Sequence, residues 1–263
     1  MTIIAKKSLG QNFLIDKNVI DKIIQITKIH KKNILEIGPG TGNLTENILK
    51  ENPNYLTVIE KDENLCQKLF LRFKDKIRII NNDVLKENLE TMNLDKKFTV
   101  FGNLPYNIST EIICKWVLNL KDTCWFDELI LMFQKEVADR IIAKENTSQF
   151  GRLAVLINWR LNVKKVFDVS PNSFSPKPKI DSSVLHFMPK NEFHKFKNSK
   201  NIEKITRVFF NQRRKMIKNP LKQLFKNPKD ISDKLNIDLN LRPQNLSLLK
   251  FYEIITEYEK LRS

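Results

Sequence analysis

The stretch that decides the fold is Ile34-Leu35-Glu36-Ile37-Gly38-Pro39-Gly40-Thr41-Gly42-Asn43, an apolar run that enters a loop with three glycines. The run predicts a buried strand, and the residues that follow, Leu44–Lys50, predict a helix. Glycine lets the backbone approach a ligand closely, and the N-terminal end of a helix carries partial positive charge. The spacing G-x-G-x-G departs from the G-x-G-x-x-G pattern that holds a pyrophosphate. We therefore expect a pocket for another kind of ligand at the end of this strand.

Short apolar runs alternate with helical patterns around this stretch, between residues 33 and 187. The candidate strands are Asn33–Ile37, Tyr55–Glu60, Ile77–Asn81, Phe98–Gly102, Glu128–Gln134, Leu153–Arg160 and Ser183–Met188. The candidate helices between them are Leu44–Lys50, Glu63–Phe73, Ile108–Leu118 and Lys135–Ala143. Such alternation predicts an α/β fold whose mainly parallel sheet is covered by helices on both faces. Because little helix separates the last two strands, we expect a seven-stranded sheet with an antiparallel end.

The strand pattern stops after Pro189, and the rest of the chain is typical of helices. The candidate helices are Ile202–Asn211, Lys215–Phe225, Ile231–Leu235 and Ser247–Leu261. We therefore expect two domains, residues 1–188 and residues 189–263, of which the second is small and all-helical.

The charge of the chain indicates a polyanionic partner. The net charge is +16, and the segment Lys190–Asp230 holds 13 Lys or Arg against 3 Asp or Glu. Each phosphate that a cation neutralises releases condensed counterions, so a basic segment of this kind favours binding to nucleic acid. Within the segment we expect Arg213, Arg214 and Lys215 to reach RNA phosphates.

Several classes of protein do not fit this sequence. No apolar run approaches the roughly 18 residues that would cross a membrane. The first ten residues lack the apolar core of a secretory signal, so we expect a cytoplasmic protein. The three cysteines are scattered and the three histidines lie in no recognisable motif, so we expect neither a disulfide framework nor a metal site.

Acidic residues mark the ends of the first three candidate strands. Glu36 lies just before the glycine loop, near where a cationic group of a ligand bound at Gly38 and Gly40 would lie. Glu60 closes the second strand, where an acid can accept hydrogen bonds from both hydroxyls of a ribose. Asp83 follows the third strand and is placed to contact an adenine amine. Together these residues predict a site for S-adenosylmethionine, a nucleoside with a sulfonium side chain.

The segment Asn103-Leu104-Pro105-Tyr106 directly follows the fourth candidate strand. An aromatic amine is a poor nucleophile because its lone pair is delocalised into the ring. The side-chain oxygen of Asn103 and the carbonyl of Leu104 could accept both N–H groups of such an amine and favour a pyramidal nitrogen. Pro105 restricts the backbone of Leu104, and Tyr106 offers a ring on which an extruded base can stack. The segment predicts methyl transfer to an exocyclic amine.

The chain resembles the ribosomal RNA adenine dimethyltransferase family, and within it the members that act on the small-subunit (16S) RNA. Besides the glycine loop and Asn103–Ser109, the resemblance rests on Ser8–Leu14 and Phe174–Ser182. It implies a Rossmann-like S-adenosylmethionine-dependent methyltransferase fold and dimethylation of two adjacent adenosines near the 3′ end of that RNA, within an immature 30S subunit. It also implies that Asn12 and Leu14 close over the cofactor, and that Phe174 holds the target base opposite Tyr106.

Two other functions remain open from the sequence. A large-subunit adenine methyltransferase of the macrolide-resistance type shares the fold, but such relatives generally carry Ile where Leu104 stands. A non-catalytic RNA-binding assembly factor could retain the fold, but the intact glycine loop, Glu60, Asp83 and Asn103–Tyr106 argue against a dead site. We expect a monomeric enzyme.

Overall fold

The chain divides into two compact units in a computed structural model that describes residues 5–6, 9–92 and 97–262. Ser8 of the quoted motif lies outside the described residues. The first unit, here called the sheet unit, comprises Met1–Lys115, Leu120–Ala138 and Val163–Pro189. The second, here called the helical unit, comprises Trp116–Asn119, Asp139–Asn162 and Lys190–Ser263.

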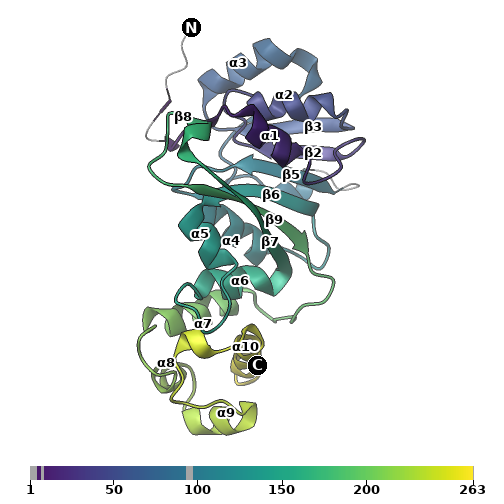
Figure 1. Cartoon of the computed structure of the whole chain (residues 1–263). Helices are drawn as coiled ribbons and strands as arrows, with labels where there is room; N and C mark the ends of the chain where they lie inside the picture. The colour runs from purple at the N-terminus through teal and green to yellow at the C-terminus, as the bar shows by residue number, and fades with distance from the viewer. Residues whose placement is uncertain (1–4, 7–8, 93–96, 263) are drawn as a thin grey trace. The chain divides into compact units, whose positions relative to one another are not determined.

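A seven-stranded sheet with the order β4-β3-β2-β5-β6-β9-β7 forms the centre of the sheet unit (Figure 1). The strands are β2 (Asn33–Ile37), β3 (Tyr55–Glu60), β4 (Arg78–Asn81), β5 (Phe98–Asn103), β6 (Phe126–Gln134), β7 (Leu161–Val169) and β9 (Ser182–Pro189). Strands β4, β3, β2, β5 and β6 pair in parallel, and β9 pairs with β6 in antiparallel orientation. The expected mainly parallel sheet with an antiparallel end is confirmed.

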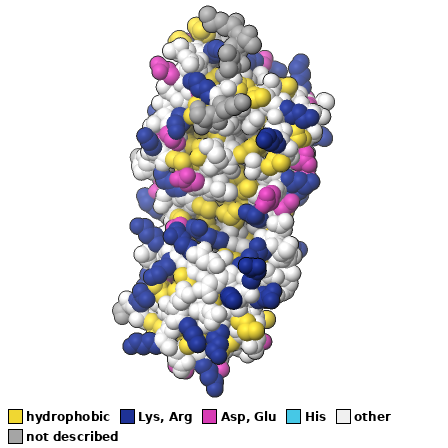
Figure 2. All heavy atoms as spheres, turned by 90° about the vertical axis from the view of Figure 1, so that its left-hand side faces the viewer, with side chains coloured by type: hydrophobic (Ala, Val, Ile, Leu, Met, Phe, Trp, Pro, Cys, Tyr) yellow, Lys and Arg dark blue, Asp and Glu magenta, His cyan; other side chains and the backbone are white. Residues whose placement is uncertain are grey.

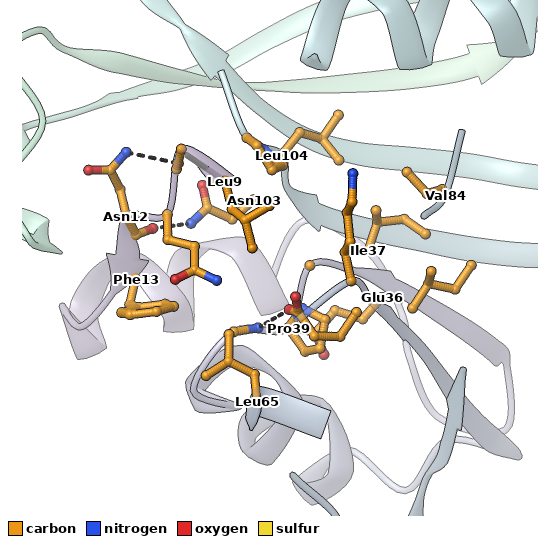
Figure 3. A pocket seen from close by; sticks show the side chains of 18 of the residues that line it. Leu9, Asn12, Phe13, Glu36, Ile37, Pro39, Leu65, Val84, Asn103 and Leu104 are labelled. Carbon is orange, nitrogen blue, oxygen red and sulfur yellow. Dashed lines mark hydrogen bonds between the residues drawn. The ribbon is translucent and has the colours of Figure 1, made fainter. Parts of the chain in front are cut away.

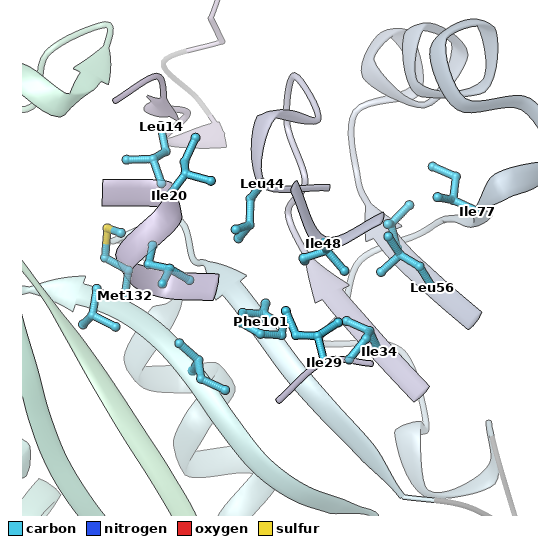
Figure 4. Packing of buried hydrophobic residues seen from close by; sticks show 14 of the residues in the cluster. Leu14, Ile20, Ile29, Ile34, Leu44, Ile48, Leu56, Ile77, Phe101 and Met132 are labelled. Atoms are coloured by element: carbon cyan, nitrogen blue, oxygen red, sulfur yellow. The ribbon is translucent and has the colours of Figure 1, made fainter. Parts of the chain in front are cut away.

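Apolar side chains of these strands alternate between the two faces of the sheet, as the period of a strand requires. One face packs against α1 (Lys17–Ile24), α2 (Asn43–Lys50) and α3 (Glu63–Phe73), as Figure 4 shows. This core includes Ile20, Ile23, Ile34, Leu44, Ile48, Leu56, Val58, Leu69, Phe73, Phe101, Ile130 and Met132. The intervening strand residues are buried on the other face, where α4 (Ser109–Asn119) and α5 (Lys135–Ile141) begin (Figure 1). Both faces of the sheet are therefore covered by helices.

The register of the parallel strands brings their carboxyl ends together. Ile37 at the end of β2 pairs with Ile59 of β3 on one side and with Gly102 of β5 on the other. Glu60 at the end of β3 pairs with Asn81 at the end of β4. The glycine loop, Glu60, Asp83 and Asn103 therefore converge on one edge, as expected for parallel sheets that bind ligands at this edge.

A separate two-stranded sheet attaches the N-terminal segment to this edge. Strand β1 (Phe13–Leu14) pairs with β8 (Phe174–Ser175) in antiparallel register, with Leu14 opposite Phe174. The Asn43 side chain at the start of α2 donates a hydrogen bond of 2.8 Å to the Leu14 carbonyl. Residues 9–14, here called the strap, are thus held next to the glycine loop.

The helical unit contains one helix that the sequence pattern misassigned. Residues Leu153–Arg160, predicted as a strand, lie in α6 (Arg152–Arg160). This helix is buried on nearly every side, so its residues show no polar face and hence no helical period. Next to it lie α7 (Lys200–Asn211) and α10 (Leu248–Lys260), and α8 (Lys218–Leu224) and α9 (Pro228–Leu235) pack against those two helices. The strand that pairs at the sheet edge is instead β7, which the sequence analysis did not identify.

Contacts of α6 with α7 and α10 explain why each unit is built from several separate segments of the chain. Arg152 donates to Glu203 of α7 at 2.7 Å, and Tyr252 of α10 donates to the Val155 carbonyl at 3.1 Å. The expected division at residues 188 and 189 therefore needs a correction, since Trp116–Asn119 and Asp139–Asn162 also group with the helical unit. Short 3₁₀ helices complete the chain at Lys74–Lys76, Leu89–Thr91, Pro171–Ser173 and Pro243–Asn245. In the described part of the chain, the helices are all too short or too polar to span a membrane.

Candidate active site

One pocket lies at the carboxyl ends of β2, β3 and β5 (Figure 3). Its walls come from the strap, the glycine loop, the segments after β3 and β4, and the segment after β5. The predicted residues that line it are Asn12, Leu14, Glu36, Gly38, Gly40, Glu60, Asp83, Asn103, Leu104, Pro105 and Tyr106. Residues far apart in the sequence are therefore brought to a single site.

The glycine loop has a backbone that other residues rarely adopt. Gly38, Gly40 and Gly42 have φ angles of 66°, 57° and 82°, in the left-handed region. A Cβ atom on Gly40 would lie 2.8 Å from the Phe13 ring of the strap. Glycine is thus required here both for the turn and for the close approach of the strap.

Glu36 lies at the floor of the pocket, where it is only 2% exposed. Its Oε2 accepts a hydrogen bond of 2.7 Å from the Thr45 hydroxyl of α2. Burial raises the pKa of Glu36 to about 8, and the neighbouring Glu60 adds to this. A cationic ligand in the pocket would therefore stabilise the ionised form of Glu36.

Glu60 connects the glycine loop to the start of α3. Its Oε2 accepts from the Gly40 amide at 3.2 Å and its Oε1 accepts from the Asp62 amide at 2.9 Å. Burial raises the pKa of Glu60, against the effect of these backbone hydrogen bonds. A carboxylate held by two amides has a fixed orientation, and each of its oxygens retains a lone pair that can accept from a ligand.

Asp62 holds the N-terminal segment near the pocket. Its Oδ1 accepts from the Lys6 ammonium at 2.8 Å and its Oδ2 accepts from the Gln11 side chain at 3.2 Å. Burial acts to raise the pKa of Asp62, but these hydrogen bonds hold it below its usual value. The strap is thus anchored to the β3–α3 turn as well as to β8.

Asp83, in the segment after β4, forms an ion pair at the rim of the pocket. The Lys61 ammonium donates to its Oδ2 at 2.8 Å, and the Leu85 amide donates to its Oδ1 at 3.0 Å. The Lys61 hydrogen bond lowers the pKa of Asp83. The residue is therefore ionised at neutral pH and can accept from an amine.

The strap fixes the side chain of Asn103 at the end of β5. The Asn103 Nδ2 atom donates a hydrogen bond of 2.9 Å to the Asn12 carbonyl, drawn as a dashed line in Figure 3. An amide group has a donor end and an acceptor end, so this bond leaves Oδ1 as the acceptor for a further ligand. Leu104, which follows, has a buried side chain, and its backbone carbonyl is the second acceptor expected from the sequence.

Tyr106 is fixed at both its backbone and its phenol. The Ser109 hydroxyl at the start of α4 donates to its carbonyl at 3.3 Å. Its phenol oxygen lies 2.5 Å from the hydroxyl of Ser182, a buried residue at the start of β9. Burial raises the pKa of Tyr106, although Ser182 acts in the opposite direction. The ring is thus held in one orientation at the pocket.

Residues 4–260 match the family model described as ribosomal RNA adenine dimethylase. The chain belongs to this family. The chain is similar along its whole length to the ribosomal RNA small subunit methyltransferase A of Pelagibacter ubique, with 58% identity over 262 residues and 100% coverage of both. The protein of the same name from a Wolbachia strain is 40% identical over 97% of this chain and 94% of its own length. The assignment made from the sequence is confirmed.

Two solved structures of methyltransferases confirm the Rossmann-like methyltransferase fold. A dimethyladenosine transferase from Plasmodium falciparum aligns with a TM-score of 0.79 and 25% identity, and covers 94% of this chain and 98% of its own. The 23S rRNA methyltransferase ErmE aligns with a TM-score of 0.68 and 21% identity, over 94% of this chain and all of its own. The second likeness concerns the fold alone.

Four of the predicted site residues lie away from the pocket lining. Phe174, on β8, is 3% exposed and packs in the sheet core beside Leu14. The other three follow α7 in the helical unit, where the Arg213 guanidinium donates to the carbonyls of Ser148 and Phe150. Arg214 and Lys215 are exposed. The sequence analysis did not predict that Arg213 holds the loop at Ser148 and Phe150, because no local pattern reveals a partner 63 residues away.

The sequence analysis also missed residues that position the predicted ones. Ser182 was quoted only as part of a motif, yet it meets Tyr106, which lies 76 positions earlier in the chain. Asp62 stands two residues after Glu60, and its bond to Lys6 spans 56 positions. Only the fold brings these partners together, so no spacing rule could have identified them.

Proposed function

We propose that this chain transfers methyl groups from S-adenosylmethionine to N6 of two adjacent adenosines near the 3′ end of small-subunit ribosomal RNA. The observation that carries the proposal is the Asn103 amide, which donates to the strap and keeps its oxygen as the acceptor for a substrate amine. This acceptor shares one pocket with the glycine loop and with Glu60. An amine-binding group and a nucleoside-binding loop in one pocket are what adenine methylation requires.

The residues of the pocket fit a cationic nucleoside. We assign Glu60 to the ribose hydroxyls and Asp83 to the adenine amine of the cofactor, because both carboxylates are held rigidly at the strand ends. We assign Glu36 and the backbone of Gly38 and Gly40 to the methionine part of the cofactor, because a buried carboxylate balances positive charge there. Asn12 and Leu14 of the strap cover the site. When bound, S-adenosylmethionine supplies the electrophilic methyl group.

The reaction at the target adenosine follows from the chemistry of an aromatic amine. Asn103 Oδ1 and the Leu104 carbonyl accept the two N–H groups of N6, which directs the nitrogen lone pair toward the methyl group. Pro105 limits the backbone of Leu104 to extended conformations and so helps to aim its carbonyl. Tyr106 stacks against the extruded base. Positioning and local electrostatics carry this reaction, without a covalent intermediate on the protein.

Phe174 enters this scheme only if it moves. We propose that it covers the face of the base opposite Tyr106, as the family resemblance implies. At 3% exposure it must first turn out of the core, where it packs beside Leu14. Its place next to the strap suits such a movement, because the same antiparallel pair joins β8 to the strap.

The substrate assignment draws on the relatives and on charge. The relatives named above are small-subunit methyltransferases, and the basic segment Lys190–Asp230 suits an RNA partner. We therefore propose an immature 30S subunit as the substrate, with Arg214 and Lys215 bound to its phosphates. Arg213 would contact a phosphate as well as the Phe150 carbonyl, to which it already donates. We further propose that the enzyme acts as a monomer in the cytoplasm.

The experiment that tests the proposal supplies labelled S-adenosylmethionine together with unmethylated small or large ribosomal subunits. Mass spectrometry of the digested RNA then identifies each labelled nucleoside and its position. We expect N6,N6-dimethyladenosine at two adjacent sites near the 3′ end of the small-subunit RNA. Label in the large-subunit RNA alone would support the macrolide-resistance type instead, and no label in either would leave only a binding role.

A further inference from the structure

A short exposed loop joins Phe174 of the proposed base site to Ser182, which contacts the other aromatic residue, Tyr106. This β8–β9 loop runs from Pro176 to Asp181, between Phe174-Ser175 of β8 and Ser182 of β9. Lys177 and Lys179 of the loop are exposed, and Ile180 is 43% exposed. The function proposed above does not use any of these side chains.

Both ends of the loop are attached to the site. Before the loop, Ser175 pairs with Phe13 of the strap. After it, Ser182 meets the Tyr106 phenol at 2.5 Å. The Lys135 amide also donates to the Asp181 carbonyl at 3.0 Å, which holds the end of the loop against α5. Any nucleotide held between Tyr106 and Phe174 therefore lies beside this loop.

The composition of the loop limits its motion. Pro176 and Pro178 alternate with the two lysines, and each proline fixes its own φ and restricts the residue before it. The side chain of Pro178 is buried, so the middle of the loop is packed against the protein. Less backbone freedom is then lost when Lys177 and Lys179 bind a partner.

The loop carries two exposed lysines and one exposed acidic residue, so its net charge is positive. Among the described residues, Lys177 and Lys179 form no salt bridge with a carboxylate. One exposed carboxylate, Asp181, stands at the end of the loop, and Asp168 of β7 is paired with Lys135 at 2.8 Å and with Lys165 at 2.7 Å. Figure 2 views the molecule from the side on which β8 lies in Figure 1, and Lys and Arg side chains on that face are interspersed with several acidic ones.

We propose that the β8–β9 loop is an RNA-binding surface of the sheet unit, with Lys177 and Lys179 on the phosphates that flank the target adenosine. Extrusion of a base leaves its two phosphates at the surface, next to the pocket that holds the base. Ile180 packs against the neighbouring nucleotide. The inference rests on the proposed function and adds a contact that acts beside the reaction, separate from the basic segment of the helical unit.

The test measures the affinity of the full-length protein for a transcript of the 3′ end of small-subunit RNA over a range of salt concentrations. Lys177→Gln with Lys179→Gln removes two cations from the loop. Lys28→Gln with Lys76→Gln is the matched control, because these exposed lysines lie before β2 and β4, at the opposite edge of the sheet. The two double variants have the same net charge.

We expect the loop variant to flatten the salt dependence of binding by about 1.4 in the slope of log K against log salt, at about 0.7 per single-strand phosphate. The control variant keeps the slope of the wild type, and both variants melt at the wild-type temperature. A loop variant with an unchanged slope, or one matched by the control, overturns the inference. Binding is measured without the cofactor, so a failure of the proposed methylation is detected separately in the wild type.

Discussion

The contact between Ser182 and Tyr106 gives a sharp test of how the base platform is positioned. Ser182→Ala removes the hydroxyl that lies 2.5 Å from the Tyr106 phenol. A hydrogen bond between two neutral groups contributes about 1 kcal/mol, equivalent to a factor of about five in a rate or an equilibrium constant. Because Tyr106 is half-buried, we take this value instead of the larger cost of a fully buried group without a partner.

The assay is steady-state methylation of unmethylated small subunits, analysed as a double-mutant cycle with Tyr106→Phe. Each single variant should lower kcat/KM about fivefold, and the double variant should be no slower than either, because both remove one interaction. Ser183→Ala is the control. Ser183 is equally buried and adjacent, but its hydroxyl donates to Asp168 at 2.6 Å.

The refuting results are specific. If Ser183→Ala lowers kcat/KM as much as Ser182→Ala, the effect comes from general packing at the start of β9. If the losses from Ser182→Ala and Tyr106→Phe multiply in the double variant, the two hydroxyls act independently. Either outcome removes Ser182 as a positioning residue.

Three further predictions concern the pocket and the glycine loop. Asn103→Ala should bind S-adenosylmethionine with nearly unchanged affinity, as measured by calorimetry. Its kcat should fall about 10²- to 10³-fold, the loss typical when one polar group at a reacting centre is removed. Turnover equal to that of the wild type would exclude the proposed action of Asn103 on the amine. Glu36 has its pKa raised to about 8 by burial, so its contribution to stability is present below pH about 4.3 and is lost as pH rises through 8. Glu36→Gln should therefore gain in melting temperature relative to the wild type between pH 5 and pH 8.5, and a constant difference would contradict this. A Cβ on Gly42, at φ 82°, would lie 2.6 Å from the Phe73 ring; Gly42→Ala should lose about 2–4 kcal/mol of unfolding free energy in denaturant titrations, and a loss below about 1 kcal/mol would indicate that the ring moves aside.

The sequence predicted the pocket edge of the sheet well because local and global signals agree there. Each of β2, β3 and β5 is a short apolar run followed at once by a polar or glycine-rich segment, so strand and site residue are read from the same few positions. Parallel pairing then brings these segments together without further information. This is why Glu36, Glu60 and Asn103 lie in one pocket as expected.

The errors have physical causes. Leu153–Arg160 is buried on nearly all sides by the helical unit, so its helix carries no amphipathic pattern and was taken for a strand. By contrast β7 alternates exposed and half-buried residues between its buried ends, Leu161 and Val169, and the matching alternation of apolar and polar residues could have been used. Contacts such as Ser182 with Tyr106 depend on side chains far apart in the chain, and only the folded structure reveals them.

A crystal structure of the protein with S-adenosylmethionine and no RNA tests the central claim most directly. The account predicts the ribose on Glu60 and the reactive methyl group exposed toward Asn103 Oδ1 and the Leu104 carbonyl, beneath the strap. A methyl donor bound elsewhere, a pocket closed to it, or an Asn103 side chain that turns its amide nitrogen toward the methyl group would contradict the account.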